Sequence, residues 1–383
     1  MSETQRRAPR TAARLRTRWD RLNGPQRIGG VDLARGLAVL GMFTAHLLWI
    51  TEPFDLAEPA TWIAVAEGRS SILFATLAGV SIGLVTGGSE PLPGPAMGVA
   101  RGRLAVRAAL LWLLGVMLVL TGVPVYVILP AYAILFLIAL AFARLPARVL
   151  LTIAGALAIV MPIVQVPLDA LPLWQTMAGN DLSLVLGWHY PFTTWIVFVL
   201  AGLGAARAGI TRLRVQLWLV GAGAALALAG YGTDAAIGAR TADAGSFAGA
   251  LWTARPHSTG LLEVIGSGGF ALAVLGVCLL ACRTFLRLIV LPLRAVGAMP
   301  LTAYTAQLVV WAVVASIVLG DPGDLRGFRA LEPFWPLTLG TVVLCTAWAL
   351  LIGRGPLETA VDRVSRWIVR GPWPARPPGR LLG

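Results

Sequence analysis

Three ionisable side chains, Asp32, Arg35 and His46, lie on the first long apolar segment of the sequence. A helix turns about 100° per residue, so the three side chains fall within a wedge of about 60° on one face. Arg35 and His46 are separated by about 16 Å along the helix axis. Ionisable groups within a membrane span are costly, usually face the bundle interior or a water-filled cavity, and mark proton or substrate sites. This face is therefore a candidate site, where an imidazole can exchange a proton and a guanidinium can hold an anion.

The same spacing also permits a purely structural interpretation. Asp32 and Arg35 are three residues apart, which suits an ion pair within one helix. An acidic residue near a helix N-terminus also complements the helix dipole. His46 would then be a hydrogen-bonded core histidine. Both interpretations stay open at the level of the sequence.

The composition indicates what kind of element must position these residues. Of the 383 residues, 57% are hydrophobic and 13% are charged, whereas about 25% of residues are charged in a soluble domain. A soluble fold of this length has too little interior to hide so much apolar surface. The net charge of +13 comes from arginines in short clusters between apolar runs, which is the pattern of membrane loops and not of a nucleic-acid surface. We expect a membrane protein that binds no nucleic acid.

Apolar runs long enough to cross a bilayer recur along the chain. They predict an all-α fold, a polytopic membrane helix bundle of about ten transmembrane helices. The predicted spans lie near residues 31–51, 69–87, 105–122, 124–143, 149–167, 191–208, 214–232, 260–282, 298–319 and 335–353. The stretch 284–296 is apolar with arginines in and beside it, and it is predicted to be a short interfacial helix.

The loop charges predict the orientation of this bundle. With the N-terminus inside, arginines gather in the inner segments and most acidic residues fall in the outer ones. This distribution obeys the positive-inside rule. It predicts both termini in the cytoplasm, with a basic arm at 1–27, a single membrane domain at 28–366 and a basic tail at 367–383. The predicted location is the plasma membrane.

The first span also carries a motif that resembles a known family. Its residues Val31 to Ala38, followed by His46, resemble the opening of the transmembrane acyltransferases. The resemblance is to the heparan-α-glucosaminide N-acetyltransferase-like group and its bacterial relatives of unassigned substrate. The ten residues between Arg35 and His46 also match the spacing in membrane acyltransferases that O-acylate bacterial surface sugars. Later segments, at 68–79, 187–202, 297–307 and 355–358, extend the resemblance over about residues 27 to 366.

The resemblance implies an enzyme that transfers an acetyl or other acyl group across the membrane. Acetyl-CoA would be the donor on the cytoplasmic side, and a sugar or another cell-envelope molecule would be the acceptor near the outer face. In the lysosomal member the catalytic histidine lies in the loop after the first span, whereas the corresponding loop here, 52–68, has no histidine. The role of base is therefore assigned to His46, and Asp32 and Arg35 complete the predicted catalytic group.

A CoA donor would also need groups that bind its phosphates, for which arginine clusters are suited. The predicted cofactor-binding residues are Arg35, on the first span, and Arg101, Arg103 and Arg107, in an inner loop. The alternative for the loop arginines is ordinary topology determination. No metal ion is expected, because no group of His, Cys and acidic residues has ligand spacing.

Five further residues are candidates for binding the acceptor. His189 and Tyr190 precede the sixth span, and they would contact an acceptor or belong to an interfacial aromatic belt. Glu263, near the outer end of the eighth span, is predicted to be a partner of His46. Tyr304 and Gln307 share a helix face, and they would contact a bound headgroup or a neighbouring helix.

Two other functional classes stay open. Polar residues along one span also suit a transporter of a small or envelope-related substrate, although no pair of broken helices marks two matching halves. A non-catalytic scaffold or sensor would use the polar face for structure alone. The expected partners are membrane lipid and a small-molecule or glycan acceptor, and a homodimer is left open. His257 is interpreted as an ordinary residue of an outer loop.

Overall fold

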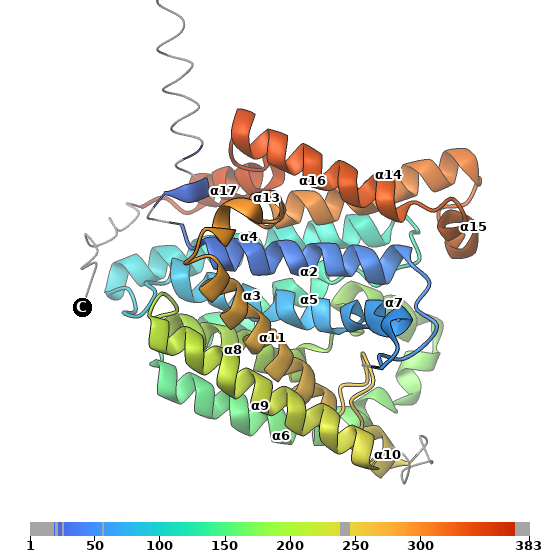
Figure 1. The fold of residues 1–383 in the computed structure, drawn as a ribbon, viewed down its shortest axis with the longest axis horizontal. Helices are drawn as coiled ribbons and strands as arrows, with labels where there is room; N and C mark the ends of the chain where they lie inside the picture. Colours follow the sequence, from blue (N-terminus) through green and yellow to red (C-terminus); the bar gives the residue numbers. More distant parts are fainter. Residues whose placement is uncertain (1–18, 20–21, 25–26, 56, 238–245, 372–383) are drawn as a thin grey trace, which may run out of the picture.

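The structure, a computed structural model, is a bundle of helices (Figure 1). It describes residues 19, 22–24, 27–55, 57–237 and 246–371. Every regular element within these residues is a helix, which confirms the predicted all-α bundle. Most of the predicted basic arm and tail lies outside the described residues.

Ten helices of the described chain occupy the positions of the ten predicted spans. They are α2 (Gly29–Leu47), α3 (Arg69–Val85), α4 (Gly94–Val119), α5 (Leu129–Phe142), α6 (Ala147–Asp169), α8 (Phe192–Arg207), α9 (Leu213–Ile237), α11 (Leu261–Ala281), α14 (Pro300–Val318) and α16 (Phe334–Leu351). Among the described residues, seven helical segments are long and apolar enough to cross a membrane, and α5 and α8 are shorter apolar helices. The remaining helix of the ten, α2, which carries the charged Asp32 and Arg35, is in neither group. The protein is a multi-pass membrane protein, and the orientation of its termini stays a prediction.

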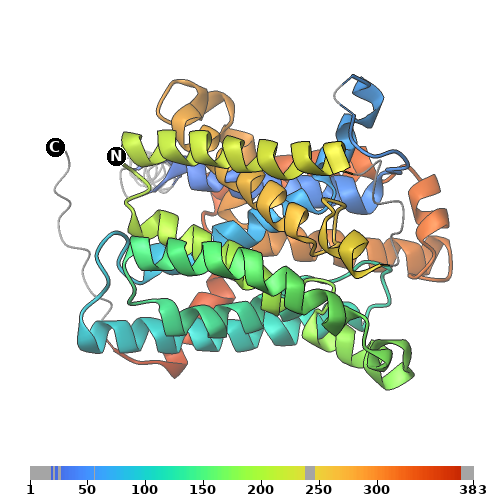
Figure 2. The same cartoon turned by 90° about the horizontal axis from the view of Figure 1, so that it is seen from below.

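The bundle has two chemically different ends. The "arginine end" is the end of the bundle at which α2 and α4 begin. The "loop end" is the opposite end, at which α2 ends and α3 begins. The loop end lies on the right in Figures 1 and 2. Short helices cover both. The arginine end holds α12 (Leu286–Ile289), α13 (Leu291–Ala298) and α17 (Pro356–Ile368), and the loop end holds the 3-10 helices η1 (Pro59–Ala66) and η2 (Pro172–Gln175) with α7 (Met177–Leu186), α10 (Phe247–Leu251) and α15 (Leu325–Ala330).

Glycines let the helices that carry the candidate site pack closely. A side chain at Gly36 of α2 would overlap the Leu293 carbonyl of α13, and one at Gly297 of α13 would overlap the Asp32 carbonyl. Small residues at such crossings are typical of membrane bundles, in which close packing and not exclusion of water holds helices together. The part of α2 that carries Asp32 and Arg35 is thus seated directly against α13.

The largest difference between a predicted boundary and the structure is at the start of the third span, and the predicted interfacial helix differs as well. The third span was predicted to begin at residue 105, but α4 begins at Gly94, so Arg101, Arg103 and Arg107 lie on a helix and not in an inner loop. Arginine is tolerated there because its long side chain can carry the charge out of an apolar layer near a helix end. The predicted interfacial helix at 284–296 consists of two short helices, α12 and α13.

Candidate functional site

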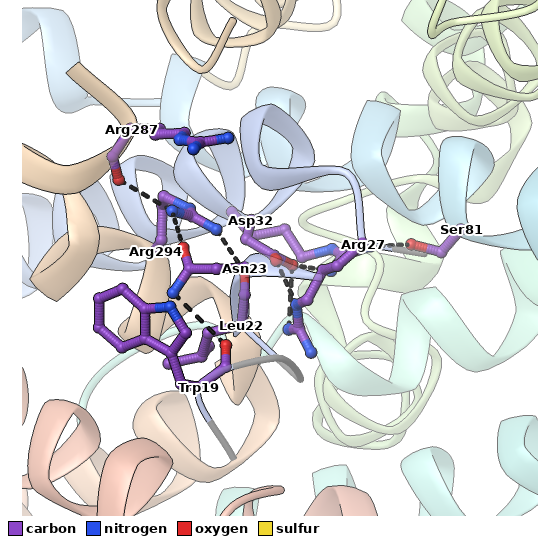
Figure 3. A network of polar contacts seen from close by, with 9 residues as sticks. Trp19, Leu22, Asn23, Arg27, Asp32, Ser81, Arg287 and Arg294 are labelled. Atoms are coloured by element: carbon purple, nitrogen blue, oxygen red, sulfur yellow. Dashed lines mark hydrogen bonds and ion pairs between the residues drawn. The ribbon is translucent and has the colours of Figure 1, made fainter. Parts of the chain in front are cut away.

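A buried carboxylate at the arginine end holds two guanidinium groups. Asp32 is 3% exposed and accepts from Arg27 and, at 3.1 Å, from Nη1 of Arg35. The other nitrogen of Arg35, Nη2, donates to the Ser81 hydroxyl of α3 at 2.9 Å (Figure 3). The one negative charge of Asp32 therefore faces two positive charges. The ion pair between Asp32 and Arg35, which the structural interpretation predicted, is present.

Arg294 fixes the segment that leads into α2. Its guanidinium donates to the Asn23 side-chain oxygen at 2.9 Å, to the Arg287 carbonyl at 2.8 Å and to the Leu22 carbonyl. Figure 3 shows this group beside the ion pairs of Asp32. Burial lowers the pKa of the Arg294 guanidinium. Arg294 of α13 thereby holds the segment before α2 through Leu22 and Asn23, and it also contacts α12 through Arg287.

Arg107 is the predicted donor-binding arginine of α4 that lies near Arg35. Both side chains are within electrostatic range of Glu358 on α17. The Glu358 carboxylate caps α14 by accepting from the backbone N–H groups of Leu301 at 2.8 Å and Thr302 at 3.1 Å. Arg35 of α2 and Arg107 of α4 therefore lie near the same carboxylate, that of Glu358, which already accepts hydrogen bonds from the backbone of α14.

The other two predicted arginines of α4 have different surroundings. Arg103 donates to the Val369 carbonyl at 3.2 Å and to the Gly371 carbonyl at 2.9 Å. It thus attaches the end of α17 to α4. Arg101 has a buried Nε atom with no hydrogen-bond partner among the described residues. Neither residue joins the group of Arg35 and Arg107.

His46, at the other end of α2, is held by α14. Its Nδ1 atom lies 3.2 Å from Nε2 and 3.4 Å from Oε1 of Gln307, and its ring centre is 6.4 Å from that of Tyr304. The Tyr304 hydroxyl accepts from the Ile128 backbone N–H at 3.4 Å. Arg329 of α15 donates to the His46 carbonyl at 3.1 Å, which caps the last turn of α2 with a cation.

A cavity of about 350 Å³ lies at the loop end. His46 and Gln307 do not line it, but His257 in its wall is within electrostatic range of His46. Its walls include Asp169, Trp174, Trp188, His189, His257 and Thr259. Trp188 donates its Nε1–H to Asp169 at 2.9 Å, and its ring stacks on Trp174 with centres 4.7 Å apart. Tyr190, predicted to bind the acceptor together with His189, is buried next to the cavity, where its ring packs edge-on against His257 at 5.7 Å.

Glu263 shapes the loop that forms one wall of this cavity. Its carboxylate is 2% exposed and accepts from the backbone N–H groups of His257 and Thr259, both at 2.6 Å, and from the Ser258 hydroxyl at 3.2 Å. His257 and Thr259 have positive φ angles of 61° and 54°, which is unusual for residues other than glycine and asparagine and is found at functional sites. Glu263 therefore pairs with this loop and not with His46, the partner predicted from the sequence.

The two histidines of the cavity are in a neutral form at pH 7. Both face the cavity, yet desolvation by the protein around it lowers the pKa of His189 and of His257 to about 4. A neutral imidazole can accept a proton from a bound hydroxyl or amine. Sequence reasoning missed His257 as a cavity residue, although Glu263 six residues later is a recognisable anchor for such a loop.

Two family models match this chain. The model of heparan-alpha-glucosaminide N-acetyltransferase, catalytic, matches residues 27–235, more than half of the chain. The chain belongs to this family. A model of a protein of unknown function (DUF418) matches residues 210–368. No curated protein and no solved structure matches the chain.

The two matched regions overlap at residues 210–235, and both contribute residues to the candidate site. Arg35, His46 and His189 lie within the acetyltransferase match, whereas His257 and Gln307 lie within the second match. The contact between His46 and Gln307 therefore joins both regions. Among the described residues, no group of three or more His, Cys, Asp or Glu side chains could hold a metal ion.

Proposed function

We propose that the protein is an acyltransferase of the plasma membrane that moves an acetyl or other acyl group from cytoplasmic acyl-CoA to a sugar or another cell-envelope acceptor near the outer face. The observation that carries this proposal is the match to the catalytic part of an N-acetyltransferase over residues 27–235. That region contains α2, whose two ends carry Arg35 and His46. The helix thus carries a guanidinium that can bind an anion near one of its ends and an imidazole near the other.

The arginine end is the proposed site of the donor, acetyl-CoA. Arg35 and Arg107 would bind its phosphates, since guanidinium groups match phosphate oxygens in charge and geometry. Asp32 holds Arg35 from one side through an ion pair of 3.1 Å, which limits the orientations open to that guanidinium. The more distant Arg101 and Arg103 would add positive charge at this end. This assignment also requires that the arginine end faces the cytoplasm.

The loop end is the proposed site of the acceptor, with His46 as the base. The acceptor hydroxyl or amine would attack the thioester carbonyl carbon and give its proton to the imidazole. The new C–O or C–N bond forms, the C–S bond breaks, and CoA leaves as a thiol that takes up the proton. Gln307 would orient the imidazole through its contact with Nδ1, a role that a hydrogen-bonded neighbour of a catalytic histidine usually has.

The test is acyl transfer by the purified full-length protein in vesicles made from envelope lipids. Acetyl-CoA labelled in the acetyl group is added, and its consumption and the labelled products are followed by mass spectrometry. The proposal predicts release of free CoA together with a product heavier by one acyl group. Substrate flux across the vesicle membrane without consumption of acetyl-CoA would instead assign a transporter.

A further inference from the structure

The hairpin of η2 and α7 carries both residues that line the polar cavity and exposed apolar residues. Trp174, Asn180 and Ser183 contribute to the walls of the polar cavity. The hairpin also exposes apolar side chains to the surroundings of the protein, and Met177 is 88% exposed. The exposed apolar side chains of the hairpin and of the turn before it are Leu171, Leu173, Met177 and Leu182. In Figure 2 the hairpin, in green, projects at a corner of the bundle at the loop end.

An apolar stripe on α6 leads to the same cavity. Ile159, Val160, Ile163 and Val164 are exposed on this helix, which is long and apolar enough to cross a membrane. Residues spaced by three and four share one side of a helix, so these side chains form a continuous surface against the lipid chains. The helix ends at Asp169, whose carboxylate lies in the cavity wall. The lipid-facing stripe and a residue of the cavity wall thus belong to one helix, where about 150° of helical rotation separates Asp169 from the centre of the stripe.

Exposed tryptophans at the loop end indicate the depth of the cavity in the membrane. Trp49 precedes η1, Trp252 follows α10 and Trp335 begins α16, and each is more than a third exposed. Tryptophan is enriched where lipid headgroups meet the hydrocarbon layer. The cavity, which lies at the same end of the bundle, is therefore at the level of the headgroups.

The Asp169 carboxylate has an acceptor position that the described residues leave open. Oδ1 accepts from Gln165 at 2.7 Å and from Trp188 at 2.9 Å. The neighbour of Oδ2 is the Thr259 hydroxyl at 3.4 Å, but that hydroxyl is only 2.7 Å from the Ser258 carbonyl. A hydroxyl has one proton to donate, and the shorter contact takes it. Oδ2 is therefore available to a hydroxyl of a bound molecule, beside the aromatic faces of Trp174 and Trp188.

We propose that the cavity binds the hydroxylated head of a membrane-anchored acceptor, a glycolipid-type molecule, while its hydrocarbon part lies along α6 and the η2–α7 hairpin. This inference rests on the proposed acyl transfer and specifies the class of its acceptor. The head would donate to Asp169 and stack on the tryptophans. Its attacking hydroxyl or amine would lie on the side of His257, which is within electrostatic range of the proposed base His46. The hydrocarbon part would remain among the lipids throughout the reaction.

The test follows the label from acetyl-CoA into two solvent phases. Membranes that contain the full-length protein are incubated with acetyl-labelled acetyl-CoA and extracted with chloroform, methanol and water. Label in lipids of the organic phase, above that of membranes without the protein, is expected. Label confined to water-soluble glycans overturns the inference but leaves the proposed function standing. If no acceptor is labelled in either phase, the proposed function itself fails.

A pair of variants tests the apolar face. The double variant Leu173→Asp, Met177→Asp changes side chains that are 45% and 88% exposed, and thermal unfolding of the purified variant checks that it is folded. The two carboxylates introduce charge where the hydrocarbon part would lie, which is unfavourable in an apolar layer, so we expect about a 10-fold loss of lipid labelling at low acceptor concentration. Trp335→Asp is the matched control, because this side chain is 64% exposed at the same end of the bundle. Unchanged labelling in the double variant overturns the inference, as does a change from dimer to monomer, which would assign the face to a second copy of the chain.

Discussion

The two ends of the bundle satisfy their carboxylates in different ways. The four ion pairs that the described residues form with one another, which involve Asp32 and Asp362 with four arginines, all lie at the arginine end. At the loop end, Asp169 and Glu263 accept from indole, amide, hydroxyl and backbone groups instead. At the loop end, the neutral hydrogen-bond donors do not cancel the negative charge of the carboxylates that they bind. At the arginine end, guanidinium groups outnumber the carboxylates, so positive charge remains.

This difference separates two kinds of chemistry along one helix. Guanidinium groups in excess suit a phosphorylated molecule, and neutral imidazoles beside carboxylates suit the acceptance of a proton. α2 connects the two ends, with Arg35 near its first turn and His46 near its last. A membrane enzyme that uses a donor from one side and an acceptor from the other needs this separation. Variants at each end test this separation.

The largest effect on stability is expected at Glu263. Glu263→Ala leaves two backbone N–H groups of a loop with positive φ angles without their acceptor, which costs about 2–3 kcal/mol. Thermal unfolding of the purified protein in detergent measures the loss. Glu263→Gln keeps one acceptor oxygen and should lose less, and Glu90→Gln, at an exposed position, serves as the control. An alanine variant as stable as the wild type would show that the loop holds its shape without the carboxylate.

The arginine end should govern the affinity for the donor. Arg35→Ala or Arg107→Ala each removes a charged hydrogen-bond donor, so the KM for acetyl-CoA should rise about 10-fold. Arg144→Ala removes an exposed arginine from the same end and should leave this KM unchanged. Steady-state release of CoA measures all three variants. Equal effects of all three would mean that general positive charge, and no defined site, attracts the donor.

The loop end should be the part that is sensitive to acid. His189 and His257 have pKa values near 4 in the folded protein and near 6.5 when unfolded. Between these values the unfolded chain binds more protons, so stability is full above about pH 6.5 and decreases as the pH falls toward 4. Because both rings face the cavity, the effect is smaller than for fully buried groups.

The pH effect can be assigned with one variant. His257→Gln should reduce the loss of melting temperature between pH 6.5 and pH 4.5 relative to the wild type. A control variant, Glu90→Gln, should retain the full loss. If the loss of stability in acid were the same in the His257 variant, the titration of other groups would account for it.

The smallest effect is expected at the cap of α2. Arg329→Gln removes the cation from the last turn of the helix, a contribution of about 0.5–1 kcal/mol. It also removes the contact of the guanidinium with the Trp49 ring, whose centre lies 4.9 Å away. Arg326→Gln, on the same short helix α15 and exposed, is the matched control. If both variants had the same melting temperature, Arg329 would not stabilise the last turn of α2.

Local sequence patterns predicted the parts of the molecule that depend on nearby residues. Hydropathy located the ten helices, because a span must be apolar along its own length. Helical periodicity predicted that Asp32 and Arg35 share a face, and they form an ion pair three residues apart. The family resemblance found from the motif at 31–46 is confirmed by the match at 27–235.

Contacts between distant residues could not be predicted in this way. Gln307 follows His46 by 261 residues, and no local pattern relates the two. The assignment of Glu263 to His46 was wrong because three donors in the preceding loop lie nearer to the carboxylate. The start of α4 was misplaced because Arg101 and Arg103, in the first half of the helix, resemble a loop in composition while remaining compatible with a helix.

The most direct test of the central claim is the rate of acetyl transfer from acetyl-CoA by the His46→Ala variant. The account predicts a folded protein with an unchanged KM for acetyl-CoA and a turnover at least about 100-fold lower, the usual contribution of a general base. Gln307→Ala should give a smaller loss of turnover, because it disturbs only the orientation of the ring. A folded His46→Ala protein that transfers acetyl groups at the wild-type rate would contradict the account.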